Sequence, residues 1–198
     1  MNDLVSIIMP SYNTGRFIKE TIESVLAQSY PVWELIIVDD CSTDNTDDVV
    51  NQYLADERIR YIKNDTNSGA AVSRTRALRE AKGKWIAFLD SDYLWEPLKL
   101  EKQIAFMQEN GYAFSYTDYM IQLNGEWLPY IYTGPRVVTR RKMYDYCYFS
   151  TITVMYDRDV IGLIQIENLR KNNDYAMWLQ AIEKSNCYRF SECLSYYI

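Results

Sequence analysis

The sequence predicts an α/β fold built on a mixed, mainly parallel central sheet with helices on both faces. The first observation is the alternation of strand-like and helix-like segments over 4–88, which repeats three times before a fourth strand. Such alternation is typical of parallel strands joined by right-handed helical crossovers. The second observation is a change of pattern after residue 111 to short strand-like runs, which predicts a small antiparallel part.

Apolar runs bounded by turn-forming residues indicate buried strands in the first half. These runs cover 4–9, 33–38, 59–62 and 85–88. Apolar residues at helical spacing between the runs predict helices. These segments cover 18–26, 49–54, Gly69 to Lys82, and Pro97 to Gly111. Glycine directly after a helix is a common C-terminal stop, and Gly83 and Gly111 fit that role.

The second half mixes strands with one clear helix. Strand-like runs cover 113–116, 152–156, 187–190 and 194–198, and Leu123-Asn124-Gly125-Glu126 is a hairpin signal. A helix opens at Asp174, with Tyr175, Trp178, Leu179 and Ile182 on its apolar face. We therefore expect one domain with two halves, 1–111 and 112–198. The chain stops on an apolar strand, from which we expect a further C-terminal part to be missing.

Composition excludes several classes of function. The 198 residues contain no histidine, so Ser-His-Asp, Cys-His and His-ligated metal chemistry are excluded and carboxylates remain as acid-base groups. The net charge is −6 and the only basic cluster is 140–142, which argues against nucleic acid as a partner. The four cysteines lack CxxC spacing, so neither a zinc site nor a disulfide framework is predicted. We find no signal peptide and no apolar stretch of about 20 residues, which favours the cytoplasm.

Two carboxylates, Asp90 and Asp92, follow the strand predicted at 85–88. Residues two apart in extended chain point to the same side, so the two anions face one point. A hard divalent cation is the natural counter-charge, with phosphate oxygens completing its shell. The alternative is a polar strand end that enters a turn, and a short acidic motif alone favours that alternative. Asp39 and Asp40 end the strand at 33–38 in the same way, and ligands bind beyond such carboxyl ends.

Four ordered motifs resemble glycosyltransferase family 2. They are Val5-Ser6-Ile7-Ile8-Met9-Pro10-Ser11-Tyr12-Asn13, Val38-Asp39-Asp40-Cys41-Ser42-Thr43-Asp44, Asn67-Ser68-Gly69 and Phe88-Leu89-Asp90-Ser91-Asp92. The resemblance covers essentially the whole chain, and four motifs in order are far more specific than one. It implies the Rossmann-like GT-A fold, with 1–111 binding the nucleotide sugar and 112–198 facing the acceptor. It also implies transfer with inversion.

The resemblance implies a set of donor-binding residues. They are Pro10, Ser11, Tyr12, Asn13, Asp40, Asn67, Gly69, Arg74, Arg76, Asp90 and Ser91. In this set Asp40 accepts a hydrogen bond from N3–H of uracil, which favours UDP or dTDP. Asp39 is either the acid nearer the strand or a cap in a turn, and both interpretations stay open.

The helix after Asn67-Ser68-Gly69 bears on phosphate binding. Its N-terminal amides are placed to face a diphosphate. It carries Arg74 and Arg76 on different faces, so one of them reaches the diphosphate or the carboxylates and the other is a solvated arginine.

The same resemblance makes Asp92 the ligand of a divalent metal, Mn or Mg, with Asp90 as its partner acid. Many relatives continue with another aspartate where this chain has Tyr93, so one anion is missing from the rim. That change puts metal affinity in doubt more than metal use.

Asp174 matches the position of the family's catalytic base, in a segment where Asn173 replaces a glutamate. Inverting transfer needs such a base opposite the leaving group. The competing interpretation of Asp174 is a helix cap or first-turn acid, and the two roles are compatible. Trp178 is an acceptor platform or a core residue, and we favour the core. The Gln-x-x-Arg-Trp signature of processive members is absent, which predicts transfer of a single sugar.

The sequence thus predicts a metal-dependent inverting transferase of bacterial surface-glycan synthesis. Its expected partners are a UDP-sugar donor and an oligosaccharide acceptor that is lipid-linked or carried on a glycoprotein. A homo-oligomer and a peripheral position at the inner face of the plasma membrane are compatible with it. The rival predictions are a sugar nucleotidyltransferase, which lacks support because 10–13 is not a Gly-rich basic segment, and a non-catalytic nucleotide-sugar-binding module.

Overall fold

A computed structural model describes residues 3–123, 125–164, 169 and 171–198. Within these residues one ten-stranded sheet has the order β3-β2-β1-β4-β9-β6-β10-β5, with β7 on β6 and β8 on β10. The strands are β1 Val5–Ser11, β2 Trp33–Asp39, β3 Ile59–Lys63, β4 Trp85–Phe88, β5 Tyr93–Trp95, β6 Phe114–Leu123, β7 Glu126–Trp127, β8 Val137–Val138, β9 Met155–Asp157 and β10 Cys187–Tyr197.

Seven α-helices and one short 3-10 helix accompany the strands in the described part of the chain. They are α1 Ile18–Leu26, α2 Thr46–Asn51, α3 Ala70–Glu80, α4 Lys99–Asn110, α5 Arg140–Asp145, η1 Thr151–Thr153, α6 Arg158–Ile161 and α7 Asn173–Ile182. None of the helices within the described ranges is both long and apolar enough to cross a bilayer.

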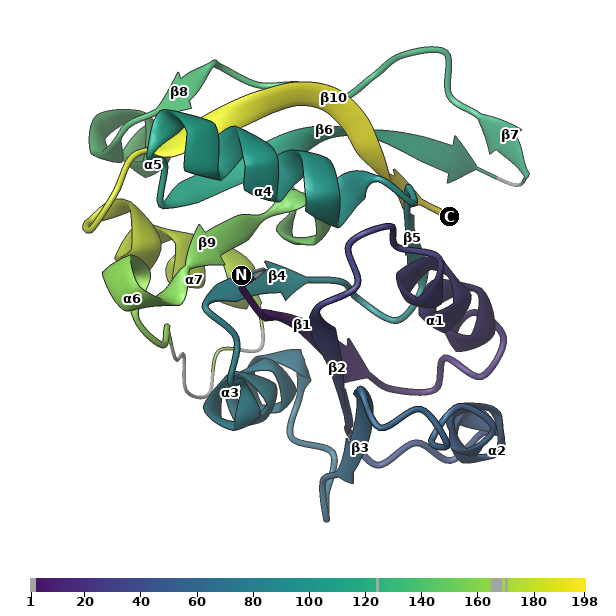
Figure 1. The fold of residues 1–198 in the computed structure, drawn as a ribbon. Coiled ribbons are helices and arrows are strands. Elements are labelled where there is room, and N and C mark those ends of the chain that lie inside the picture. Colours follow the sequence, from purple (N-terminus) through teal and green to yellow (C-terminus); the bar gives the residue numbers. More distant parts are fainter. Residues whose placement is uncertain (1–2, 124, 165–168, 170) are drawn as a thin grey trace.

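The sheet is mixed, as the sequence predicts. Strands β3, β2, β1 and β4 run parallel. Strand β9 is antiparallel to both β4 and β6, and β10 is parallel to β6 and antiparallel to β5. The long β10 arches beside β6 over the second half (Figure 1). Because β9 and β10 pair with β4 and β5, the two halves share one sheet.

Two apolar clusters cover the two faces of this sheet. Successive residues of a strand point to opposite faces, so Ile7 packs with α1 and α4, whereas Ile8 packs with α3 and α7. Figure 1 shows α1 and α3 on opposite sides of β1. Every residue of β1 and β2 is buried, as expected for parallel strands covered on both faces.

The structure corrects several predicted elements. The strand predicted at 152–156 starts only at Met155, because Thr151–Thr153 forms a buried 3-10 turn. The strands predicted at 187–190 and 194–198 are one strand, β10, whose register shifts absorb the polar residues between them. The second helix ends at Asn51, before the last residues of its apolar stripe.

Other local predictions hold. Gly111 ends α4 in the left-handed conformation, with φ of +65°. The hairpin is confirmed by the pairing of β6 with β7, in which Leu123 faces Glu126. Its Asn124 lies outside the described residues.

Candidate active site

A cavity of about 400 Å³ opens beyond the carboxyl ends of β1, β2 and β4. Parallel sheets bind ligands at this edge because the strand ends and the helix N-termini meet there. Its lining consists of Pro10, Ser11, Tyr12, Thr14, Asp40, Asn67, Gly69, Ala70, Ser73, Arg74, Asp90, Ser91, Asp92 and Tyr93. All the residues predicted from the sequence to bind donor or metal lie in this lining except Asn13 and Arg76.

Asp40 holds the loop that leads into α3. Its carboxylate accepts hydrogen bonds from the backbone amides of Ser68 at 2.9 Å and Gly69 at 2.6 Å, and from Nδ2 of Asn64 at 2.8 Å. Gly69 is the N-cap of α3 with φ of +92°, a conformation that favours glycine. The Ser68 amide also contacts the second carboxylate oxygen at 3.1 Å. A carboxylate has about four acceptor positions, so these hydrogen bonds use the whole acceptor capacity of Asp40 to order the loop.

Three further residues considered in the sequence analysis lie outside the cavity lining. Asp39 accepts a hydrogen bond from the amide of Ser42 at 2.9 Å, which agrees with its interpretation as a turn cap. Asn13 bridges to the same turn, since its Oδ1 accepts from the amide of Thr43 at 2.8 Å. Arg76 donates to the carbonyl of Lys63 at 2.6 Å and lies outside the lining. These three residues make contacts next to the cavity and do not line it.

Arg74 is the arginine of α3 that enters the cavity. Its side chain is buried, and Nη2 donates to Oδ1 of Asp90 at 2.7 Å. Its Nη1 donates to Oδ1 of Asn173 at 2.6 Å, which joins the donor half to the first turn of α7. Burial works against the charged form, but the charges of Asp90 and Asp174 outweigh it and the pKa of Arg74 is raised. The guanidinium is therefore a positive charge in the cavity lining that is held in place by two hydrogen bonds.

Among the described residues, no ion pair is found between a cationic side chain and the carboxylate of Asp92, whereas Asp90 pairs with Arg74. Burial and the nearby charge of Asp90 raise the pKa of Asp92 to about 6. No described side chain donates a hydrogen bond to it.

The metal predicted at Asp90 and Asp92 fits these donors, because hard divalent cations prefer carboxylate oxygens. The described residues contain no group of three or more His, Cys, Asp or Glu side chains placed to hold a metal ion. A cation here therefore needs oxygens from a bound ligand in addition to the two carboxylates.

Asp174 lines a second cavity, of about 340 Å³. It is the second residue of α7, whose N-cap is Asn172, so Asp174 is a first-turn acid and not the cap. The remaining lining is Tyr119, Tyr132, Thr133, Tyr146, Cys147, Tyr148, Phe149, Ser150 and Tyr197. The sequence did not single out these tyrosines, because they come from four separate segments.

The two cavities adjoin each other. The rings of Tyr93 from the first cavity and Tyr197 from the second lie 4.0 Å apart between centroids. Arg74 of the first cavity is bonded to Asn173, the neighbour of Asp174. Arg74 is therefore close to both the acidic strand end and Asp174. Trp178, one turn further along α7, is fully buried against Phe88, which confirms its core role.

Comparisons with known proteins agree with this geometry. The model of the family described as glycosyl transferase family 2 matches residues 6–161. A Bacillus subtilis protein named as a teichuronic acid biosynthesis glycosyltransferase, TuaG, is 46% identical over 197 residues, which are 98% of this chain and 78% of that protein. The Escherichia coli UDP-Glc:alpha-D-GlcNAc-diphosphoundecaprenol beta-1,3-glucosyltransferase WfgD is 40% identical over 183 residues, or 92% of this chain and 71% of its own.

The solved structures show the same fold. S. aureus TarS 1-349 in complex with UDP superposes with a TM-score of 0.83 and 26% identity, over 97% of this chain. This chain spans 59% of that TarS chain. The family model covers most of the chain. The sequence identities to TuaG and WfgD, 46% and 40%, are high enough to establish membership of the same family. The protein therefore belongs to glycosyl transferase family 2 and has the mixed α/β fold, GT-A, of that family.

Proposed function

We propose that the protein transfers one sugar from a UDP-sugar to an acceptor hydroxyl, with inversion at the anomeric carbon, in the synthesis of a bacterial surface polysaccharide. The observation that carries this proposal is that two cavities adjoin, one lined by Arg74 and the acidic strand end and the other by Asp174. The TarS structure with UDP supports the donor, and the names of TuaG and WfgD support a surface-glycan product.

The donor half is suited to a nucleoside diphosphate. The N-terminus of α3, whose first residue Ala70 lines the cavity, and the guanidinium of Arg74 supply positive potential at one side of the cavity. We assign N3–H of uracil to Asp40, where it would replace one of the hydrogen bonds from the loop, and Tyr12, half exposed in the lining, offers a ring to the base. A divalent cation held by Asp92, with Asp90 beside it, would neutralise the charge that develops on the leaving diphosphate.

The chemical step assigned to the protein is one proton transfer. Asp174 takes the proton of the acceptor hydroxyl while that oxygen forms a bond to the anomeric carbon and the bond to UDP breaks. Inversion requires the base and the leaving group on opposite sides of the sugar, and the separate cavities provide two such sides. Arg74 holds the first turn of α7, which carries Asp174, through its hydrogen bond to Asn173.

A lipid-linked oligosaccharide is the acceptor that the comparisons favour, because WfgD acts on a diphosphoundecaprenol-linked sugar. We place the reaction in the cytoplasm, at the inner face of the plasma membrane, where such an acceptor and UDP-sugars meet. An acceptor on a glycoprotein is the second candidate. The sugar-nucleotidyltransferase alternative loses its support, because the chain belongs to a transferase family.

The proposal is tested by measuring UDP release from a panel of UDP-sugars with manganese present. Asp174→Asn should keep its affinity for UDP and lose turnover by about 10²-fold or more, because only the proton acceptor is removed. Asp48→Asn, an exposed aspartate of α2, is the matched control and should behave like the wild type. Equal turnover in Asp174→Asn and wild type would exclude Asp174 as the base, and pyrophosphate release from UTP and a sugar phosphate would revive the rival activity.

A further inference from the structure

Helix α4, which packs on β6 and β10 (Figure 1), carries a lysine in the core of the protein. Lys99 is the first residue of the helix, and its side chain is fully buried. Lysine is rarely buried without a paired charge, yet no carboxylate in the described part of the chain forms an ion pair with it. A cation at a helix N-terminus also lies at the positive end of the helix dipole. Both features cost stability, so the contacts of this amine need an explanation.

The ammonium group of Lys99 contacts two uncharged side chains. Its Nζ donates to Oε1 of Gln103, one helical turn further along α4, at 2.7 Å. It also lies 4.2 Å from the centroid of the Trp95 ring in β5, and cation–π attraction there partly offsets the lost hydration. Charged side chains on neighbouring elements have other partners. They are Glu96 with Tyr196, Glu101 with Ser29, Lys102 with Glu192 and Asp118 with Arg189.

Gln103 connects the lysine to the η1 turn. It is fully buried, and its Nε2 donates to the carbonyl of Thr153 at 3.0 Å and to Oγ of Ser115 at 3.0 Å. These hydrogen bonds allow one orientation of the amide, because the opposite orientation would point its NH2 group at the ammonium. Lys99 therefore determines which way the amide of Gln103 faces, and with it the contact to the turn.

A second carbonyl of the same turn is also bound. Nε1 of Trp95 donates to the carbonyl of Ile152 at 2.9 Å, and Oγ of Ser195 donates to the same carbonyl at 3.3 Å. This Trp95 ring is the one that lies against the ammonium of Lys99. The lysine therefore contacts two of the side chains that hold carbonyl groups of η1.

The η1 turn is joined to the wall of the second cavity. Ser150, the N-cap of the turn, lines that cavity, and its carbonyl accepts from Oγ1 of Thr153 at 2.6 Å. Its hydroxyl bonds with that of Tyr197, another lining residue. The ring of Tyr197 in turn lies against Tyr93 of the first cavity. A shift of the turn would therefore move side chains at the junction of the two cavities.

We propose that Lys99 and Gln103 act as a positioning pair, which fixes the η1 turn in the wall of the second cavity. The pair lines neither cavity and acts through the backbone of Thr153. This inference rests on the proposed transferase function and extends it to residues away from the site. Loss of the pair should disturb turnover and leave UDP binding intact, because Ser150 lines the second cavity and not the first.

The first test measures UDP release and, by calorimetry with manganese, the affinity for UDP. The variants are Lys99→Met and Gln103→Leu, which nearly keep the size of each side chain. Each should lower kcat about tenfold, as expected for one buried hydrogen bond, with KM for the UDP-sugar and the affinity for UDP within about twofold. The double variant should lose little more than Gln103→Leu alone, because the lysine acts through Gln103. Lys102→Met, which removes a surface lysine of the same helix, is the matched control.

The second test needs no catalysis. Burial lowers the pKa of Lys99 to about 7, against about 10.4 in an unfolded chain. Opening of the core around the pair hydrates the amine, so the open form binds more protons and the closed form gains stability as the pH rises above about 7. The amides of Thr153 and Val154 are hydrogen-bonded within the turn. Their hydrogen exchange, corrected for its intrinsic rate, should slow about tenfold from pH 6.5 to pH 8.5 in the wild type and not in Lys99→Met.

The outcomes separate this inference from the transferase function. Unchanged kcat in both single variants would overturn the positioning role, and so would an equal loss in Lys102→Met. A loss of UDP affinity as large as the loss of kcat would overturn it as well, because the damage would then extend to the first cavity. Exchange at the turn that responds to pH equally in wild type and Lys99→Met would show that the lysine does not hold the turn. Absence of any turnover by the wild type bears on the transferase proposal instead, and the exchange measurement then decides the role of the pair.

Discussion

Asp92 lowers the stability of the folded protein in its ionised form. Burial and the charge of Asp90 raise its pKa to about 6, above the value of about 3.9 for an exposed aspartate. The folded state therefore holds this proton more tightly than the unfolded state, and the stability contributed by the protonated form is lost as the pH rises from about 4 to about 6. A buried, unpaired carboxylate of this kind is typical of a functional site.

Asp92→Asn should raise the melting temperature at pH 7.5 and change it little at pH 4, because only the ionised carboxylate is unfavourable. The same variant should weaken manganese-dependent binding of UDP, which calorimetry measures directly. Asp48→Asn serves again as the control for a generic loss of one negative charge. A melting temperature that falls at pH 7.5 would show that Asp92 is paired in the folded protein and would remove this account of the site.

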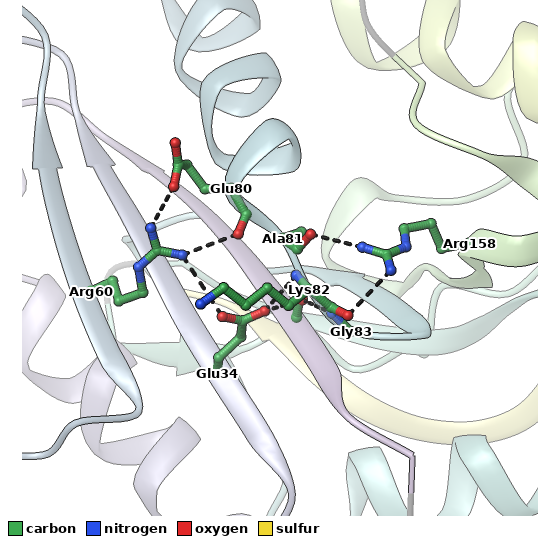
Figure 2. Close-up of polar contacts among 8 residues, drawn as sticks. Glu34, Arg60, Glu80, Ala81, Lys82, Gly83 and Arg158 are labelled. Atoms are coloured by element: carbon green, nitrogen blue, oxygen red, sulfur yellow. Dashed lines mark hydrogen bonds and ion pairs between the residues drawn. The ribbon is translucent and has the colours of Figure 1, made fainter.

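At the scale of elements, helix α3 is held at both ends. Asp40 binds the amides that precede it, and a second group of side chains binds the turn that follows it (Figure 2). One of these side chains is Glu34 of β2. Its carboxylate accepts hydrogen bonds from the amide of Lys82, in the turn, at 2.7 Å and from Oγ of Ser6 at 2.6 Å. Gly83 passes so close that a Cβ there would lie 2.6 Å from the amide nitrogen of Ser6.

Two arginines donate hydrogen bonds to the carbonyl groups at the end of α3. Arg60 donates to the carbonyl of Glu80 at 3.0 Å, and Arg158 donates to that of Ala81 at 2.7 Å. They approach the turn from opposite sides in Figure 2. Cations at a helix C-terminus also interact favourably with its dipole. Helix α3 carries Arg74 and its first residue lines the cavity at the strand ends, so this turn and Asp40 together set the position of that cavity wall.

Glu34→Ala should lower the free energy of unfolding by about 2–3 kcal/mol, because it leaves a partly buried amide and a buried hydroxyl without their acceptor. Chemical denaturation with a linear extrapolation gives this value. Glu109→Ala, on the exposed side of α4, is the matched control and should change stability by less than about 0.5 kcal/mol. Equal effects in the two variants would mean that Glu34 is no more than a surface charge.

At the scale of the whole molecule, the donor and acceptor halves form one folding unit. Strand β9 inserts between β4 and β6, and β10 pairs with β5 from the first half. Both apolar clusters also draw residues from both halves, as in the contact of Phe88 with Trp178. Removing either half exposes a strand edge and the apolar residues that packed against it in the two clusters.

We therefore expect a fragment of residues 1–111 to be unfolded or aggregated, although it contains most of the donor-binding residues. The full chain should unfold in a single transition, with coincident curves by circular dichroism and tryptophan fluorescence. A fragment that gives dispersed NMR signals and binds UDP would show instead that the donor half is an independent domain. Two separate transitions in the full chain would contradict the single unit in the same way.

The sequence by itself determined the strands and helices of the first half, apart from the short strand β5, and the acidic strand ends that line the first cavity. These follow from local rules, because apolar spacing and turn residues are read over a few positions and parallel strands must end at one edge. The elements after residue 111 were predicted less accurately from the sequence. There the burial of Thr151–Thr153 and the register shifts in β10 depend on neighbours far away in the chain.

Only the tertiary structure decided which arginine lines the cavity and what surrounds Asp174. Spacing placed Arg74 and Arg76 on different faces of a helix, but the bond of Arg74 to Asn173 joins residues 99 positions apart. The cavity beside Asp174 likewise assembles tyrosines from four segments of the chain. Contacts of this kind arise when distant segments pack, and no local pattern of residues encodes them. For this protein the donor edge was therefore predictable, while the acceptor side came from the packing of the second half against the first.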